Sequence, residues 1–312
     1  MKILIFGSGG IGGYFGARLA EAGEEVVFVA RGAFAEALHR DGLRIFSARG
    51  DLHLKPVAVH ESAETTGAVD AVLICTKMWS LPEAAEAIRP LLTPDTAVVP
   101  LQNGVEAVDW LSEAIGPENL LGGVAYISAH IEAPGTIRHN TQHARIVFGE
   151  LDGRRSARAE ALYEALERAG IDAVLTDDVT RALWEKFSTL APLAGACSYF
   201  RKDIAGVRDS AGGRELLQAL AGECIAVGRA RGVALPEGWE DKVYARFDEL
   251  GGAVKPSMLV DLERGNPLEL EWLSGATLRL GEATDIDTPA SRKVYNELRP
   301  FAEGRSKSLA EG

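Results

Sequence analysis

Short apolar runs alternate with helix-like segments along the first half of the chain. The compact apolar runs, which we interpret as buried strands, span residues 3–6, 26–29, 71–76 and 97–101. The segments with helical spacing span residues 11–21, 81–92 and 105–115. Strands that alternate with helices in this way predict right-handed βαβ units and a parallel sheet.

The pattern changes between residues 120 and 150, where shorter apolar segments are separated by turn residues. We expect these segments to be short strands that complete the same sheet in mixed orientation. A polar helix over residues 156–169 and a last strand over residues 173–175 are expected to close the domain.

Beyond Asp177 and Asp178 only helical patterns remain. The expected helices span residues 181–190, 215–231, 240–250, 257–263 and 268–280. The sequence therefore predicts an α/β domain over residues 1–177 and an all-helical domain over residues 178–312. No long flexible linker joins them, so we expect the two domains to pack closely and to leave a cleft.

Composition and charge narrow the choice of partners. Apolar residues make up 46% of the chain and charged residues 25%, as in soluble globular proteins. The formal net charge is −12 and no run is rich in lysine and arginine, so we expect neither a nucleic-acid nor a membrane partner. No apolar segment approaches the roughly 18 residues of a membrane span, and the apolar N-terminal run is too short for a signal peptide. We therefore expect a cytoplasmic protein.

The sequence does not decide the oligomeric state, and it indicates that the three cysteines are reduced. The apolar helices of the second domain suit a homodimer interface or the core of that domain alone, and the pattern does not choose between them. Cys75, Cys197 and Cys224 are far apart and odd in number, which fits neither a disulfide framework nor a metal site. We interpret them as buried thiols in a reducing compartment.

A glycine-rich turn follows the first expected strand. Gly7, Gly9 and Gly12 form the pattern G-x-G-x-x-G, in which the first glycine permits a tight turn and the second lets a pyrophosphate approach the backbone. The third glycine allows close packing of helix on strand, and the helix N-terminus supplies free N–H groups. This context predicts a Rossmann-type dinucleotide-binding domain, the alternative being a tight turn without a ligand. The predicted cofactor contacts are Gly7, Ser8, Gly9, Gly10, Ile11 and Gly12.

The residue at the end of the second strand bears on the choice of cofactor. Sites for NAD usually place Asp or Glu there, to accept a hydrogen bond from the ribose 2′-hydroxyl. This chain has Arg31, which can instead pair with a 2′-phosphate. The sequence therefore favours NADPH, unless Arg31 is an ordinary surface arginine.

Two further polar residues follow expected strands. Lys77 comes after the strand at residues 71–76, and Asn103 comes shortly after the strand at residues 97–101. Because ligands in such sheets bind beyond the carboxyl ends of the strands, either residue can reach cofactor and substrate. The alternatives are a solvated lysine and a turn formed by Asn103 with Gly104.

The first helix of the second domain carries a lysine on its apolar side. Lys186 lies three residues after Leu183 and four before Leu190, on a stripe that also includes Phe187. Such a lysine either extends its charge to solvent or acts chemically. It can serve as the general acid for the alkoxide that forms when a ketone accepts hydride.

Three other residues of the second domain are candidates. Ser257 and Asp261 are four residues apart and share one helix face. Glu269 stands at the third position of an expected helix that starts at Asn266, where a glutamate completes a capping box without any substrate. The residues alone do not separate that structural role from a catalytic one.

Together these motifs resemble the ketopantoate reductase family (2-dehydropantoate 2-reductases) over nearly the whole chain. The resemblance rests on GSGGIGG, Arg31, T-K-M-W at Lys77, Q-N-G-V at Asn103, L-W-E-K at Lys186, S-M-L-x-D-L and P-L-E-L-E-W. It implies that the glycine turn and Arg31 hold NADPH, and that Lys77 and Asn103 contact cofactor and substrate. It further implies that Ala129 lies near the nicotinamide, that Lys186 is the proton donor, and that Glu269 is a second catalytic residue that hydrogen-bonds at the substrate and cofactor. It implies that Ser257 binds the acid group of the substrate, and we expect Asp261, on the same helix face, to bind the substrate as well.

The chain departs from the family where the substrate is expected. Members that make pantoate commonly have asparagine at the positions of Leu190, Ala194, Ile204 and Ser274. Pro192 is also expected to interrupt and kink the helix that carries Lys186. The implied function is reduction of 2-dehydropantoate to pantoate, for pantothenate biosynthesis. The alternatives are a reductase of a more apolar 2-oxo acid, or a non-catalytic NADP(H)-binding regulatory protein.

Overall fold

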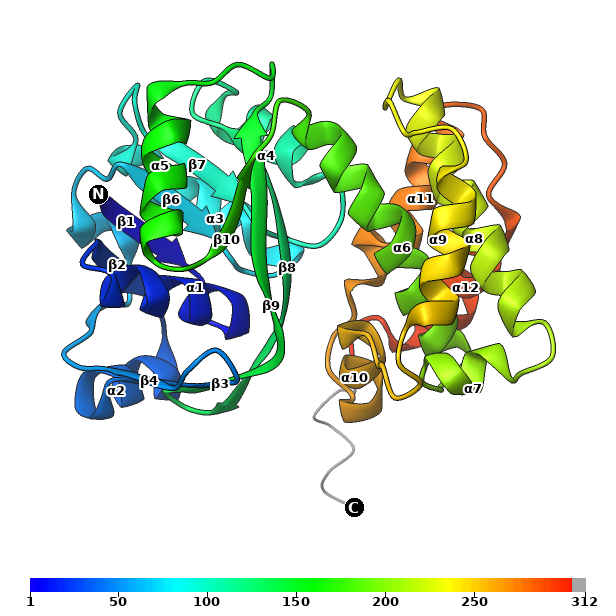
Figure 1. Cartoon of the computed structure of the whole chain (residues 1–312), viewed down its shortest axis with the longest axis horizontal. Helices are drawn as coiled ribbons and strands as arrows, with labels where there is room; N and C mark the ends of the chain where they lie inside the picture. The colour runs from blue at the N-terminus through cyan, green and yellow to red at the C-terminus, as the bar shows by residue number, and fades with distance from the viewer. Residues whose placement is uncertain (305–312) are drawn as a thin grey trace. The chain divides into compact units, whose positions relative to one another are not determined.

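The computed structural model describes residues 1–304, which fall into two compact units (Figure 1). The first unit comprises Met1–Gln102 and Ala107–Thr180. The second comprises Asn103–Glu106 and the described residues from Arg181 to Gly304. The first unit thus ends at Thr180, against residue 177 in the prediction, and the short segment Asn103–Glu106 belongs to the helical unit.

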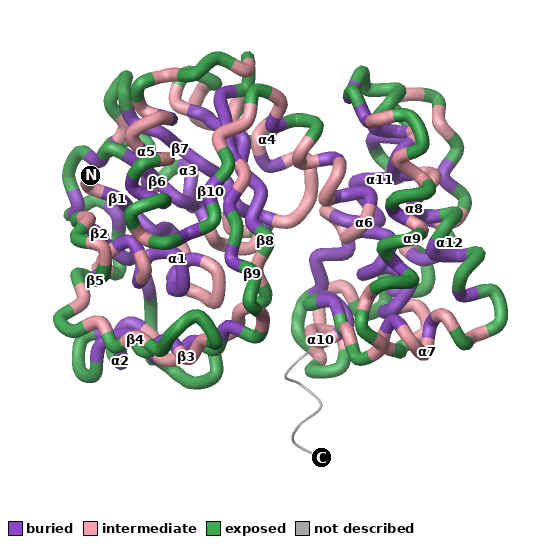
Figure 2. Tube along the Cα trace, in the orientation of Figure 1, coloured by how far each residue is buried: buried purple, intermediate pink, exposed green. Residues whose placement is uncertain are grey.

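The first unit is built on a fully parallel sheet. Its strands are β1 (Lys2–Phe6), β2 (Glu25–Val29), β5 (Ala58–His60), β6 (Ala71–Ile74) and β7 (Ala97–Pro100). They lie in the order β5-β2-β1-β6-β7, so the direction of winding reverses beside β1. β1, β6 and β7 are almost wholly buried, as Figure 2 shows. The predicted α/β class, with a parallel-sheet domain before a helical one, is confirmed.

A second sheet, which the sequence pattern does not predict, adjoins the first. Its strands are β3 (Leu43–Ser47), β4 (Leu52–Leu54), β8 (Leu121–Ala133), β9 (Thr136–Glu150) and β10 (Asp172–Leu175). The order is β10-β9-β3-β4, with β8 antiparallel to β9 along its length. The prediction of several short strands that complete the first sheet is therefore wrong. One isolated bridge between Val98 and Leu120 relates this region to the first sheet.

The misreading of β8 has a simple physical cause. Gly122 and Gly123 look like turn residues in the sequence, but both lie inside a strand. A Cβ atom on Gly122 would stand 2.6 Å from the side chain of Val179, and one on Gly123 would stand 2.5 Å from that of Val99. These glycines make room for neighbouring side chains rather than for a turn.

The helix α1 (Gly10–Glu21) packs unusually closely on the first sheet. A Cβ on Gly12 would stand 2.8 Å from the side chain of Ile5, and one on Gly16 would stand 2.5 Å from that of Phe28. Interior glycines cost a helix about 0.5–1 kcal/mol each relative to alanine. The close approach to the sheet explains why they stand here.

The same helix also contacts the second sheet. A Cβ on Gly10 would overlap the carbonyl oxygen of Ala129 in β8, and one on Gly13 would overlap the side chain of Ile137 in β9. α1 therefore lies between two sheets, with glycines facing both. The other helices of this unit are α2 (Gly32–Asp41), α3 (Leu81–Ile88), α4 (Ala107–Ile115) and α5 (Ala157–Arg168).

The second unit, within the described residues, consists of helices and their connections. They are α6 (Val179–Phe200, which begins in the first unit), α7 (Ile204–Arg208), α8 (Gly213–Ala230), α9 (Trp239–Glu249), α10 (Ser257–Arg264), α11 (Ser274–Glu282) and α12 (Pro289–Leu298). The helix α8 is central, because it packs against α7, α9, α11 and α12.

The predicted interruption at Pro192 is wrong, because α6 continues through it as one helix of 22 residues. Proline removes one backbone donor and disfavours the helix interior. Here its flanks, Ala191, Leu193 and Ala194, are buried in the core of the unit. Tertiary packing therefore holds the helix together across a residue that is locally unfavourable.

A buried ion pair fastens α5 to the sheets of the first unit. Glu150, at the end of β9, accepts two hydrogen bonds of 2.8 Å from Arg158, and both side chains are less than a tenth exposed. The remaining donors of Arg158 reach the carbonyl oxygens of Thr96 and Glu118. Burial alone would raise the pKa of Glu150, but the bonds from Arg158 and Ser156 outweigh it and lower that pKa.

We expect Arg158→Ala to lower the free energy of unfolding by about 3–5 kcal/mol, because it leaves the Glu150 carboxylate buried without its partner. Urea unfolding followed by circular dichroism measures the loss. Arg155→Ala is the matched control, since Arg155 pairs with Glu160 in the same way but at the exposed surface. Similar losses for the two variants would contradict the structural role of the buried pair.

Candidate active site

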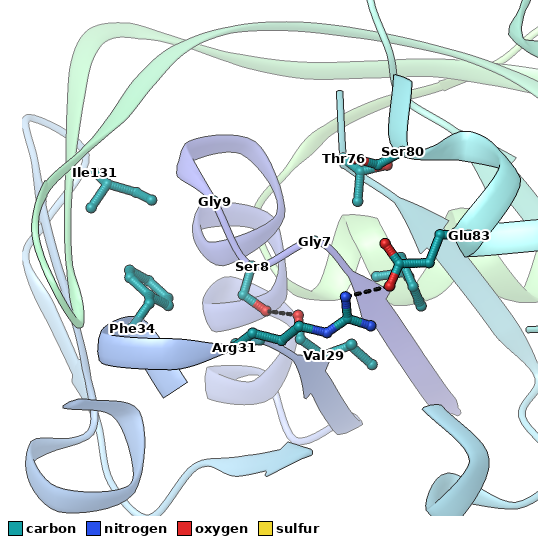
Figure 3. Close-up of a pocket in the computed structure, with 12 residues that line it drawn as sticks. Gly7, Ser8, Gly9, Val29, Arg31, Phe34, Thr76, Ser80, Glu83 and Ile131 are labelled. Atoms are coloured by element: carbon teal, nitrogen blue, oxygen red, sulfur yellow. Dashed lines mark hydrogen bonds and ion pairs between the residues drawn. The ribbon is translucent and has the colours of Figure 1, made fainter. Parts of the chain in front are cut away.

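A pocket of about 280 Å³ opens beyond the carboxyl ends of β1, β2 and β6 (Figure 3). It is lined by Phe6, Gly7, Ser8, Gly9, Val29, Ala30, Arg31, Phe34, Thr76, Ser80, Glu83 and Ile131. Open parallel sheets bind their ligands at this edge, where the winding direction of the strands reverses. We call this cavity the glycine-turn pocket.

The three glycines of the motif occupy three different environments. Gly7 has a φ of +99°, a conformation that side chains rarely adopt. A Cβ on Gly12 would overlap the carbonyl oxygen of Gly7, so this position serves the contact between helix and turn. A Cβ on Gly9, in contrast, would meet no atom within 4 Å. The open space at Gly9 is the side from which a ligand can approach the backbone.

The start of α1 offers donors to an anion. Gly9 is the N-cap residue, and it has no side chain that could cap the first N–H groups of the helix. These groups and the helix dipole suit a pyrophosphate. Ser8 is buried, and its hydroxyl donates to the carbonyl oxygen of Val29 over 2.9 Å, so its side chain ties the turn to β2. The hydroxyl of Thr76 is buried beside the pocket and has no hydrogen-bond partner among the described residues.

The side of the pocket next to β2 carries a cation and an anion. Arg31 is the N-cap residue of α2, and its Nε donates to the carbonyl oxygen of Glu61 over 3.3 Å. Its guanidinium also forms an ion pair with Glu83 of α3. In Figure 3 the two side chains point toward each other. The sequence motif points to Arg31 but gives no sign of Glu83.

The other predicted cofactor residues lie outside the lining of this pocket. Gly10 and Ile11 form the first turn of α1, and Gly10 lies against the backbone of Ala129, where β8 has an irregularity in its pairing. Lys77 precedes a 3₁₀ turn, Met78–Ser80, and its Nζ stands 5.8 Å from the ring centroid of Trp79.

A polar cluster occupies the second unit. The Nζ of Lys186, on α6, donates to Oδ1 of Asn103 over 2.8 Å. The carboxylate of Glu269, which is 3% exposed, acts electrostatically on the same lysine. We call Lys186, Asn103 and Glu269 the lysine cluster. The structure brings together three residues that the sequence analysis proposed separately.

The face of α6 that carries Lys186 differs from the predicted stripe. Trp184 and Phe187 are buried in the core, whereas Leu183 and Leu190 are only half-buried, as is Lys186 itself. Lys186 therefore shares its face with the half-buried leucines rather than with the core. A long cationic side chain is tolerated at such a position.

Asn103 reaches the lysine because the segment Asn103–Glu106 packs against the helical unit. Gly104, with a φ of +108°, places its backbone against the carbonyl oxygen of Trp272. Glu106 accepts a hydrogen bond of 2.8 Å from Arg279. No local pattern in the sequence reports these contacts, since they join residues more than 150 positions apart.

Glu269 does not cap a helix as the sequence pattern suggests. The predicted helix from Asn266 is wrong at its start, because residues 269–272 form a 3₁₀ turn and α11 begins only at Ser274. Asn266 instead donates to the carboxylate of Asp261, which lies within α10. The side chain of Glu269 is thus buried without capping a helix, and it acts electrostatically on Lys186.

The remaining candidates occupy varied surroundings. Ser257 is exposed in the first turn of α10, and Asp261 is half-buried one turn further on. Of the four positions at which the sequence departs from the family that it resembles, Leu190 is half-buried and the other three are buried: Ala194, Ile204 and Ser274.

The lysine cluster suits proton transfer. Burial lowers the pKa of Lys186 to about 8, and the Glu269 carboxylate partly opposes this change. A general acid works best when its pKa is near the working pH. The cysteines do not offer a competing nucleophile, since burial raises the pKa of each thiol to about 12. Residues 1–304 contain no cluster of metal-ligating side chains and no helix that is long and apolar enough to cross a membrane.

Comparisons with known proteins cover both units. The family model described as ketopantoate reductase PanE/ApbA matches residues 3–153, and its C-terminal counterpart matches residues 178–302. A 2-dehydropantoate 2-reductase from Mesorhizobium japonicum is 36% identical, across 98% of this chain and 99% of that protein. YkpB from Bacillus subtilis, an uncharacterised oxidoreductase, is 31% identical across 96% and 99%. The crystal structure of a 2-dehydropantoate 2-reductase from Geobacter metallireducens is 33% identical, with a TM-score of 0.89 across 96% and 99%.

We expect the ammonium group of Lys186 to titrate near pH 8, and we expect Glu269→Gln to lower its pKa further, because the change removes the carboxylate that favours the charged form. NMR of ¹³C-labelled lysine measures the titration, with the signal assigned by its loss in Lys186→Ala. Glu185→Gln is the control, since Glu185 neighbours the lysine in sequence but pairs with Arg181. An unchanged titration in Glu269→Gln would show that the cluster is not electrostatically coupled.

Proposed function

Because this chain belongs to the ketopantoate reductase family, we propose that it reduces a 2-oxo acid with NADPH, and that ketopantoate is the first candidate. The observation that carries this proposal is the lysine cluster. It combines a cation of lowered pKa with an amide and a carboxylate.

The chemistry assigns a role to each member of the cluster. When bound, NADPH supplies the hydride that adds to the ketone carbon. Lys186 donates a proton from Nζ to the ketone oxygen as that oxygen becomes an alkoxide, so the product is the alcohol. Asn103 holds Nζ in place through its 2.8 Å bond, and Glu269 keeps the lysine protonated at neutral pH.

The residues of the glycine-turn pocket suit the cofactor. The open backbone at Gly9 and the free N–H groups of α1 fit a pyrophosphate, and the guanidinium of Arg31 fits a 2′-phosphate. Val29, Ala30, Phe34 and Ile131 supply apolar surface for a base. The backbone of Ala129, and Lys77 beside its 3₁₀ turn, are proposed to contact the part of the cofactor beyond the pyrophosphate.

A second candidate is a 2-oxo acid that is more apolar than ketopantoate. Leu190 shares the face of Lys186 and stands where pantoate-forming members commonly have an asparagine. An apolar position rejects a hydroxylated substrate only weakly, whereas a lost amide removes a specific hydrogen bond. Ser257 and Asp261 are proposed to bind the substrate in either case.

We expect the purified chain to oxidise NADPH when ketopantoate or a close 2-oxo acid is added. The fall in NADPH absorbance measures the rate. Lys186→Ala should lower kcat by about 10²–10⁴-fold, as the loss of a general acid does, while NADPH affinity is kept. Unchanged turnover would remove Lys186 from the mechanism. Tight NADPH binding without turnover of any oxo acid would favour a regulatory protein instead.

We expect Arg31→Ala to weaken the binding of NADPH far more than the binding of NADH, because only NADPH carries the 2′-phosphate that the guanidinium pairs with. Equilibrium titration of each nucleotide, by quenching of protein fluorescence, measures the two dissociation constants. Arg40→Ala, which changes an exposed arginine of α2 that pairs with Asp41, is the control. Equal losses for both nucleotides would refute the proposed role of Arg31.

A further inference from the structure

Arg31 and Glu83 are the two charged residues among those that line the glycine-turn pocket. They come from different elements, since Arg31 follows β2 and Glu83 lies in the first turn of α3. Their side chains are 58% and 52% exposed, so a ligand from solvent can reach both. Their ion pair leaves the pocket wall with no net charge.

Glu83 does not perform the local task that its position suggests. The segment Ser80-Leu81-Pro82-Glu83 has the spacing of a capping box, in which serine and glutamate would bond to the first backbone N–H groups of the helix. The Ser80 side chain makes no such bond. The carboxylate of Glu83 is instead turned to the guanidinium of Arg31, as Figure 3 shows.

We propose that Glu83 sets the preference of this pocket between NADPH and NADH. The inference rests on the proposed function and deepens it. A 2′-phosphate carries a charge of about −1.5 to −2, so it must displace the carboxylate from Arg31 and is repelled by it. A free ribose hydroxyl can instead donate to Glu83, as it does to the acidic residue in NAD sites. Glu83 therefore reduces the ratio of NADPH affinity to NADH affinity.

The ion pair is suited to such an exchange. Exposed pairs of this kind contribute little to stability, so breaking one to admit a phosphate costs little. The Nε of Arg31 keeps its bond to the carbonyl oxygen of Glu61 when the carboxylate leaves. The guanidinium then remains beside the pocket, with its other nitrogens available for a bidentate contact.

Glu83→Gln tests the proposal, since it removes the charge and preserves the shape. The probes are NADPH and 2′,5′-ADP, which carry a 2′-phosphate, and NADH and 5′-ADP, which do not. We expect both 2′-phosphate ligands to bind about tenfold more tightly. We expect NADH and 5′-ADP to bind no more tightly than before, because their free 2′-hydroxyl exchanges a carboxylate acceptor for a weaker amide acceptor. Calorimetry of the two ADP isomers reports binding without any turnover. The gain should shrink at high salt, because the groups are exposed.

Glu86→Gln is the matched control, because Glu86 is an exposed glutamate of the same helix that does not line the pocket. It changes the net charge equally and should leave all four affinities unchanged. The inference would be overturned if Glu86→Gln raised the affinity for the 2′-phosphate ligands as much as Glu83→Gln does. It would also be overturned if Glu83→Gln changed the affinities for all four ligands by the same factor. If the unaltered protein binds none of the four, the proposed function fails with it. If it binds NADPH and Glu83→Gln keeps the ratio of NADPH to NADH affinity, only the role of Glu83 fails.

Discussion

The close packing of α1 between two sheets is the constraint on which the first unit depends. Gly12 and Gly16 admit the parallel sheet, while Gly10 and Gly13 admit the long strands β8 and β9. These four glycines therefore set the distance between α1 and each sheet. They also set where the N-terminus of α1 lies beside the turn at Gly7. Because a protein interior is nearly incompressible, one added methyl group on either face would displace the helix or a strand. The position of the glycine-turn pocket thus depends on packing along α1 as well as on the residues of the turn.

Much of this frame was predictable from the sequence, because its signals are local. Compact apolar runs identify β1 and β6, and the spacing of the glycine motif identifies the turn. The second sheet was not predictable, because β9 pairs with β3 and β10, which lie far away in the chain. Gly122 and Gly123 also mislead, since glycine signals a turn by its flexibility but stands in β8 for its small size. A single sequence does not distinguish these two uses of glycine.

In the candidate site, too, some features were predictable from the sequence and others were not. The spacing of Lys186 from Leu183 and Leu190 was enough to place the lysine on a particular helix face. Its bond to Asn103 could not be foreseen, because it depends on a loop that follows β7 but packs with the helical unit. The capping pattern at Glu269, which the sequence alone did not separate from a catalytic role, is not realised, because residues 269–272 form a 3₁₀ turn. A capping pattern likewise conceals Glu83, whose partner lies on another element. Polar residues near helix starts are ambiguous because one side chain can satisfy either its own helix or a distant group.

The two candidate sites share an electrostatic arrangement that suits a chain of net charge −12. In each, a carboxylate of the protein acts on a cation. Glu83 forms an ion pair with Arg31, and Glu269 acts electrostatically on Lys186. The consequences differ with burial. At the exposed pair, solvent weakens the attraction, so a ligand phosphate can take the place of the carboxylate. In the lysine cluster, burial favours the neutral amine, and Glu269 limits that effect so that the pKa stays near 8. Under the proposed function, the same pairing makes the partner of Arg31 exchangeable for a ligand phosphate and leaves Lys186 able to donate its proton.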